Sequence, residues 1–354
     1  MLQRAGAWFL YSGIQNEAGG VARYYRSDIR ENARVSTEIT GYSISALALL
    51  HARTGCAEYA EAALRAARFL TQRAWDPMLR AFPFEWHSNG HAPQPLTYFF
   101  DSGIIVRGLL TAYRRVRREQ QFLDAAAACG CAMLSDFVTG EAIHPILSLP
   151  KKNHLPYEPR WSAGPGCYQL KAALAWFELA EETGESRFRD AYEESLDRAL
   201  VCHETFLPGD TRRDKVMDRL HAYTYFLEGL IPRLSLRKCA DAFKAGVGRI
   251  AHYLREIAPE FARSDVYAQL LRVRLYGEAV GVLPLDEAAA AHEAEELATF
   301  QLSSSDLRID GGFSFGRRGS ESLPFVNPVS TAFCMQALDL WNNRSQAFST
   351  QDLI

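Results

Sequence analysis

The sequence alternates between two kinds of helical segment, and this alternation limits the possible folds more than any other feature. One kind is amphipathic: in residues 57–75, alanines and leucines recur every three or four positions, while Glu58, Arg65 and Arg68 cover the other side. The other kind, such as ITGYSISALALL at residues 39–50, is apolar or small on nearly every side. A helix of the second kind must be enclosed by other helices, so the chain predicts an inner and an outer layer.

The two kinds follow each other along the whole chain at a mean step of roughly sixty residues, as expected for repeated helix pairs with long loops. The expected inner helices are 39–50, 101–113, 166–180, 219–231, 264–277 and 330–341. The expected outer helices are an N-terminal helix and residues 57–75, 120–138, 186–206, 236–257 and 285–302. We interpret the N-terminal helix as part of the fold and not as a targeting segment.

The first and last helix pairs resemble each other. GGVARYY leads into VSTEITGY near the start, and DGGFSFGRR leads into VSTAFCMQAL near the end. Open solenoids usually have terminal repeats that differ from the others as caps, so similar ends favour a closed ring. We therefore predict an all-α (α/α)6 toroid of twelve helices in six hairpins, with residues 39–50 beside 330–341. No linker divides the chain, which indicates one domain over residues 1–354.

Composition excludes several classes of function. The formal net charge of −3 is not that of a general nucleic-acid binder, and no apolar run reaches the length of a membrane span. The seven cysteines are scattered through apolar helical segments without zinc-site spacing, which is typical of reduced core cysteines in a cytoplasmic protein. Nucleotide-binding and zinc-peptidase motifs are absent from the sequence, so we expect no metal and no cofactor. The oligomeric state is left open.

Acidic residues recur where the inner helices begin. In a ring of hairpins all inner helices run in the same direction, so these starts meet at one rim. The candidate catalytic carboxylates there are Glu38, Asp101, Asp218 and Asp265. Helix capping is the alternative explanation for each, because acidic residues are favourable at helix N-termini. It is weakest for Glu38, since Ser36 or Thr37 can cap that helix.

The loops that lead to this rim are long and rich in aromatic and basic residues. Aromatic rings beside carboxylates and arginines suit a sugar, and arginines suit an acidic sugar through paired contacts to its carboxylate. The alternative is that Trp86 and Trp161 only seal the loops against the barrel. The candidate substrate-binding residues are Arg23, Tyr24, Trp86, His87, Tyr157, Arg160, Trp161, His221, Phe313 and Arg317.

The double-glycine and aromatic turns that lead into small-residue inner helices resemble those of the (α/α)6-toroid carbohydrate enzymes. These comprise glycosidases, unsaturated-uronyl hydrolases, polysaccharide lyases and uronyl C5-epimerases. The stretch DGGFSFG…STAFCMQALDLW is also similar to the repeats of terpene cyclases and prenyltransferase β subunits. The acidic cluster of the cyclases and the zinc ligands of the prenyltransferases are not recognisable here. The resemblance extends over the chain as architecture, with no single catalytic motif matched.

The resemblance and the rim residues together predict an enzyme that acts on an oligo- or polysaccharide, including one with uronic acid. A glycoside hydrolase needs two carboxylates across a cleft, for which Glu38 and Asp101 are the first choice. One alternative is a lyase or epimerase, in which Tyr157 or His154 would remove a proton while Arg160 neutralises the uronate. The other is a non-catalytic protein that binds glycans or assists polysaccharide assembly.

Overall fold

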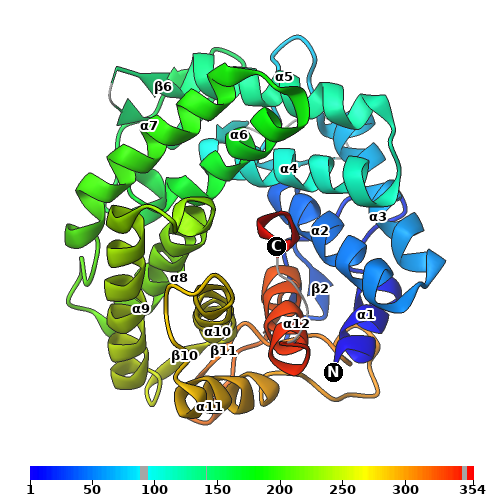
Figure 1. Cartoon of the computed structure of the whole chain (residues 1–354). Helices are drawn as coiled ribbons and strands as arrows, with labels where there is room; N and C mark the ends of the chain where they lie inside the picture. The colour runs from blue at the N-terminus through cyan, green and yellow to red at the C-terminus, as the bar shows by residue number, and fades with distance from the viewer. Residues whose placement is uncertain (88–94, 141, 345–348) are drawn as a thin grey trace.

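The computed structural model describes residues 1–87, 95–140, 142–344 and 349–354 (Figure 1). Twelve α-helices lie in this part of the chain, as predicted. The outer helices are α1 (Leu2–Tyr11), α3 (Ala57–Phe69), α5 (Gln120–Phe137), α7 (Ser186–Cys202), α9 (Arg237–Ile257) and α11 (Glu287–Ala298). The inner helices are α2 (Thr37–Thr54), α4 (Phe99–Thr111), α6 (Gln169–Thr183), α8 (Arg213–Leu230), α10 (Ser264–Ala279) and α12 (Pro328–Asn342).

The inner helices form a closed ring. Figure 1 shows α12 returning to lie beside α2, with the outer helices around them. The ring of Phe333 on α12 meets that of Tyr42 on α2 edge to face, with centroids 5.3 Å apart. This confirms the predicted contact between residues 39–50 and 330–341. Neighbouring inner helices approach closely because small residues face each other: a Cβ added to Gly108 would lie 2.6 Å from the backbone oxygen of Gly41.

Short strands tie the loops together at the rim where the inner helices begin. They are β1 (Tyr25–Arg26), β2 (Glu31–Asn32), β3 (Val35–Ser36), β4 (Glu85–Trp86), β5 (Leu96–Tyr98), β6 (Val138–Thr139), β7 (Ala142–Ile143), β8 (Ile146–Ser148), β9 (Asn153–His154), β10 (Phe261–Arg263), β11 (Gly316–Arg318), β12 (Glu321–Ser322) and β13 (Phe325–Val326). Strand β1 pairs with β13, so the first and last loops are joined. These strands could not be predicted from the sequence, because two or three residues carry too little periodicity.

The far end of the ring is filled by charged side chains and by the segment Ser349–Ile354. Lys171 on α6 and Arg272 on α10 both bind Glu228 on α8, and all three side chains are fully buried. Leu353 and Ile354 are buried in the same region, where Lys171 donates a hydrogen bond of 2.9 Å to the carbonyl of Ile354. Figure 1 accordingly shows the C-terminal residue near the centre of the ring. The cavity described below therefore opens at the other end.

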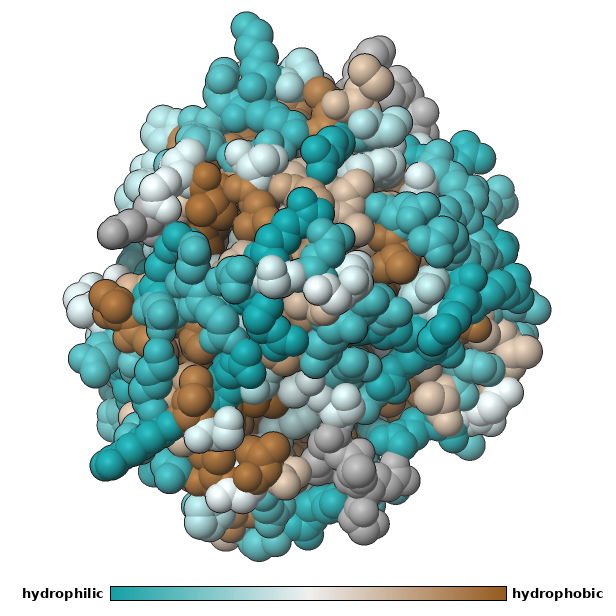
Figure 2. Space-filling view, turned by 45° about the horizontal axis from the view of Figure 1, so that its top comes forward, coloured by the Kyte–Doolittle hydropathy of each residue, from teal (hydrophilic) through white to brown (hydrophobic). Residues whose placement is uncertain are grey.

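The face of the molecule in Figure 2 is mainly hydrophilic, with hydrophobic residues in scattered groups. Among the described residues, none of the helices is both long and apolar enough to cross a membrane. The seven cysteines carry free thiols in the described structure.

Candidate active site

A cavity of about 270 Å³ opens at the rim where the inner helices begin. Its volume is near the lower end of the range for small-molecule sites, about 300–1,000 Å³. Eight of the predicted site residues line it: Arg23, Tyr24, Glu38, Asp101, Arg160, Trp161, His221 and Asp265. Ile39, Phe84, Tyr98, Phe100, Pro145, Ser162, Tyr168, Tyr225, Arg263, Phe315, Asn327 and Val329 complete the lining. We call this cavity the central pocket.

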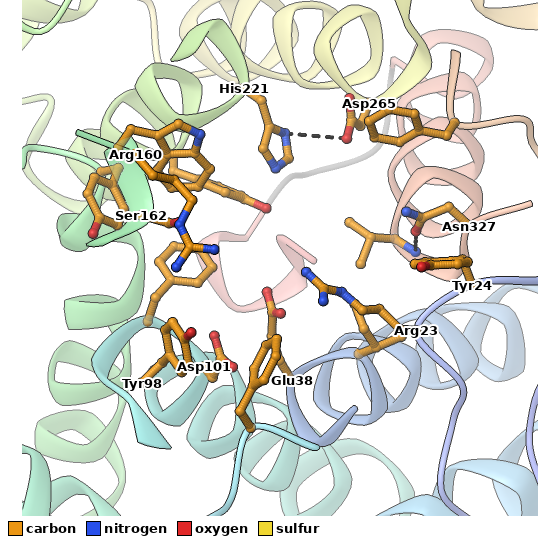
Figure 3. Close-up of a pocket in the computed structure, with 18 of the residues that line it drawn as sticks. Arg23, Tyr24, Glu38, Tyr98, Asp101, Arg160, Ser162, His221, Asp265 and Asn327 are labelled. Atoms are coloured by element: carbon orange, nitrogen blue, oxygen red, sulfur yellow. Dashed lines mark hydrogen bonds and ion pairs between the residues drawn. The ribbon is translucent and has the colours of Figure 1, made fainter. Parts of the chain in front are cut away.

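Glu38 is free of any capping role. The hydroxyl of Ser36 caps helix α2 by accepting a hydrogen bond of 3.3 Å from the amide of Ile39. Glu38 projects into the central pocket near Arg23 (Figure 3), and no described residue donates a hydrogen bond to its carboxylate. Removal from bulk water raises the pKa of Glu38 to about 7, against the opposing charge of Arg23. The group can therefore exchange a proton near neutral pH.

Asp101 lies beside Glu38 on the neighbouring inner helix (Figure 3). It is not a cap either, because helix α4 begins at Phe99. The carboxyl oxygen Oδ2 is buried and has no hydrogen-bond partner in the described structure. Burial, and then the charge of Glu38, raise the pKa of Asp101 well above its usual range. Both effects favour the protonated form of Asp101.

Asp265, across the pocket, is bound by an arginine. The guanidinium of Arg263 makes two hydrogen bonds to its carboxylate, of 3.0 and 2.6 Å, and a third of 2.9 Å to Asp218. Burial is the largest single effect and opposes ionisation of Asp265, but the charge and hydrogen bonds of Arg263, together with His221, outweigh it, so the pKa of Asp265 falls below its usual value. Asp218 does not line the pocket. Both carboxylates are thus committed to Arg263, which sets them apart from Glu38 and Asp101.

His221 points into the pocket from the wall opposite Glu38 (Figure 3). Its Nδ1 lies 2.7 Å from Oε1 of Gln269, an acceptor, and 3.5 Å from the Asp265 carboxylate. This places the ring proton on Nδ1 and leaves Nε2 as an acceptor. Burial lowers the pKa of His221 to about 4, so the ring is neutral at physiological pH.

Two arginines of the pocket are not held in close ion pairs by the described residues. Arg23 stacks over the ring of Phe84 at 5.0 Å and forms no ion pair among the described residues. Arg160 has only a 4.0 Å contact with Glu158, and both side chains are largely exposed. Two cations beside aromatic rings can bind an anionic group of a ligand.

The other predicted site residues lie outside the central pocket. Phe313 is completely buried in the core, and Arg317 pairs with Glu296 on α11. Tyr157 stacks on His144, and its hydroxyl approaches the His144 ring. The same imidazole stacks on His154, so this cluster stabilises a loop beside the pocket. Trp86 and His87 line a neighbouring groove.

The pocket also contains residues that the sequence analysis did not select. Tyr225 lies one helical turn after His221 on α8, and Arg263 directly precedes the start of α10, so these two positions could have been identified from the sequence. Tyr98 and Tyr168 carried no such signal, because aromatic residues before a helix more often belong to the core. Within the described residues, no group of three or more histidines, cysteines or acidic residues could hold a metal ion.

No family model matches the sequence, and neither does any curated protein. Solved structures do resemble the fold. A cellobiose 2-epimerase from Bacillus thermoamylovorans has a TM-score of 0.71 and 14% identity, covering 94% of this chain and 95% of its own. A D-mannose isomerase has a TM-score of 0.71 and 10% sequence identity, and the match covers 95% of each chain. An unsaturated glucuronyl hydrolase from a Bacillus species has a TM-score of 0.67 and 14% sequence identity, and the match covers 97% of each chain. These matches establish the (α/α)6 toroid fold.

Proposed function

We propose that this protein is a carbohydrate-active enzyme that hydrolyses a glycosidic bond, with the sugar bound in the central pocket. The observation that carries the proposal is the pair formed by Glu38 and Asp101. Both carboxyl groups lie in one pocket, neither serves as a helix cap, and both have raised pKa values. Perturbed carboxyl groups that share a cleft mark a candidate acid–base site. The structural neighbours act on sugars according to their names, which agrees with this class of substrate.

The unequal environments of the two carboxyl groups assign their roles. Burial and the charge of Glu38 both raise the pKa of Asp101 and favour its protonated form, so we assign Asp101 as the general acid that protonates the departing glycosidic oxygen. Glu38 ionises near pH 7 and is the group that activates water or attacks the anomeric carbon. Arg23 favours the ionised form of Glu38, which suits that role.

The pocket chemistry favours an acidic sugar. Phe84, Tyr98 and Trp161 provide aromatic surface that can lie against the C–H face of a sugar ring. Arg23 and Arg160 provide charge for a carboxylate, whereas the charge of Arg263 is already used by Asp265 and Asp218. A substrate that contains uronic acid fits both features.

His221 supports a second candidate, a sugar epimerase or isomerase. A neutral imidazole whose Nε2 is free to accept a proton can act as the base that removes a proton from a sugar carbon. Some of the structural neighbours are epimerases or isomerases by name, and others are hydrolases.

Product analysis distinguishes the candidates. The protein is incubated with a panel of neutral and acidic oligosaccharides, and the products are examined by mass spectrometry and proton NMR. A glycoside hydrolase adds the mass of water and creates a new reducing end. An epimerase or isomerase leaves the mass unchanged, and a lyase produces an unsaturated uronate that absorbs ultraviolet light. Binding without any turnover would contradict an enzymatic function and favour a glycan-binding protein.

A further inference from the structure

A second hollow lies at the same rim, next to the central pocket. This groove, of about 500 Å³, contains two tryptophans, and we call it the tryptophan groove. It is lined by Arg73, Ala74, Trp75, Asp76, Pro77, Leu79, Ala81, Pro83, Glu85, Trp86, His87, Pro95, Leu149 and Pro150. None of these residues belongs to the lining of the central pocket.

The segment 83–86 forms a wall between the two hollows. Phe84 lines the central pocket, whereas Pro83, Glu85 and Trp86 line the tryptophan groove. This wall is fixed to the start of helix α2, because the Thr37 hydroxyl donates a hydrogen bond of 2.6 Å to the carbonyl of Pro83. Val35 pairs with Trp86 in the antiparallel ladder between β3 and β4. The groove is therefore held in a fixed position relative to Glu38.

The groove combines aromatic surface with polar groups. Trp75 and Trp86 are half-buried: Trp75 packs on Phe82 and Trp86 on Phe69, at ring-centroid distances of 4.8 and 5.2 Å. An open indole beside polar groups is the arrangement that suits a sugar ring, since a ring has an apolar C–H face and a hydroxyl edge.

Some charged groups at the groove already bind other protein groups, and one does not. Arg34 pairs with Glu85 at 3.1 Å, and Asp76 accepts two backbone amide hydrogen bonds in its own turn. Arg73 is exposed and forms no ion pair among the described residues. The Arg73 guanidinium is therefore available for the hydroxyl or carboxylate groups of a ligand.

We propose that the tryptophan groove binds further sugar units of the saccharide whose reacting unit occupies the central pocket. This inference rests on the proposed function for the identity of the ligand. It follows from the position of the groove, because one short segment lines both hollows: Phe84 lines the central pocket, and Glu85 and Trp86 line the groove. The central pocket then contacts the reacting sugar, and the groove increases affinity for longer chains.

The test compares a long and a short probe. Hexagalacturonate serves as the long probe, and 4-nitrophenyl glucuronide, with one sugar unit, serves as the short one. Binding of the hexamer is measured by calorimetry in a Glu38→Gln background, and turnover of the short probe is measured in the wild-type background. Trp86→Ala and Arg73→Glu should each weaken hexamer binding by about tenfold, which corresponds to ~1.4 kcal/mol. Arg73→Glu should also leave kcat/KM for the short probe within about twofold.

Arg65→Glu is the matched control, because Arg65 is an exposed arginine on the adjoining helix α3 and does not line the groove. Trp86→Ala removes packing on Phe69 and could therefore disturb the fold. Arg73→Glu changes only an exposed side chain, so a loss of binding in this variant is not explained by misfolding. Equal hexamer affinity in Arg73→Glu and Arg65→Glu, or no binding of the hexamer by the parent protein, would overturn the groove proposal. If the short probe is not turned over but the groove variants still lose hexamer binding, the proposed hydrolysis fails while the groove proposal stands.

Discussion

Asp101 and Glu38 lie on neighbouring inner helices, and the charge of Glu38 raises the pKa of Asp101 beyond the effect of burial. The pKa of Glu38 is raised by burial, and the positive charge of Arg23 opposes this rise. The two carboxyl groups therefore have different electrostatic environments, although both face one cavity.

Glu38→Gln should lower turnover by about a hundredfold or more, because the amide cannot accept a proton or attack as a nucleophile. At pH 5 folded Glu38 is mainly protonated, so the uncharged amide should change the free energy of unfolding by no more than about 1 kcal/mol. Steady-state kinetics and urea denaturation measure the two quantities. Glu61→Gln, an exposed change on helix α3, is the control. Near-normal turnover in Glu38→Gln would show that the carboxylate is structural.

The pH profile of kcat/KM should rise as pH increases through about 7, because Glu38 must lose its proton to act as base or nucleophile. It should fall again at higher pH, when Asp101 loses the proton that it donates. Initial rates at low substrate concentration, from pH 4 to 10, record both limbs. Activity that only falls as pH rises through about 7 would instead make Glu38 the acid.

Arg23→Met should move the rising limb of that profile to higher pH. The positive charge of Arg23 lowers the pKa of Glu38, so its removal lets the pKa rise further. Arg23→Lys should restore part of the shift. Arg26→Met is the control, because Arg26 pairs with Asp28 and does not line the pocket. If the rising limb of the pH profile does not shift in Arg23→Met, that limb reflects the ionisation of a group other than Glu38.

Trp161→Ala should weaken substrate binding by about tenfold, a loss of ~1.4 kcal/mol. Trp161 lines the pocket and contacts Tyr168 edge to face at 5.0 Å, but it is only half-buried. The melting temperature should therefore fall by no more than about 3 °C. Calorimetric titration and thermal unfolding check the two parts, with the half-buried Trp341 on helix α12 as control. A variant that simply unfolds would identify Trp161 as a seal over the barrel.

Glu228→Gln should destabilise the protein by about 3–5 kcal/mol, because it leaves Lys171 and Arg272 buried without their counter-charge. Urea denaturation followed by circular dichroism measures the change. Glu256→Gln removes only exposed charge contacts, to Arg213 and His252, and should stay within about 0.5 kcal/mol. A loss below about 1 kcal/mol in Glu228→Gln would show that water or rearrangement compensates the charges.

The fold could be predicted because helical periodicity is local. A stretch of about 15 to 20 consecutive residues is enough to show whether a helix is apolar on one side or on all sides. Six repeats of the alternation then define the inner and outer layers. The similarity of the segments around Glu38 and Ser330 also indicated closure, which the contact between Tyr42 and Phe333 confirms. Glu38 was identified in the same way, from a helix start that already had Ser36 as its cap.

The division of roles among the rim residues could not be predicted. Asp265 stands at the start of its helix much as Asp101 does, yet only Asp265 is neutralised by an arginine. Strand β10, which carries Arg263, is held by pairing with β11, where Arg263 lies opposite Gly316. Likewise Phe84 and Trp86 are two positions apart but face different hollows. The sequence determined which helices surround the cavity, because periodicity acts along one helix. The tertiary structure decided which carboxylates stay unpaired, because charge pairing acts between distant segments.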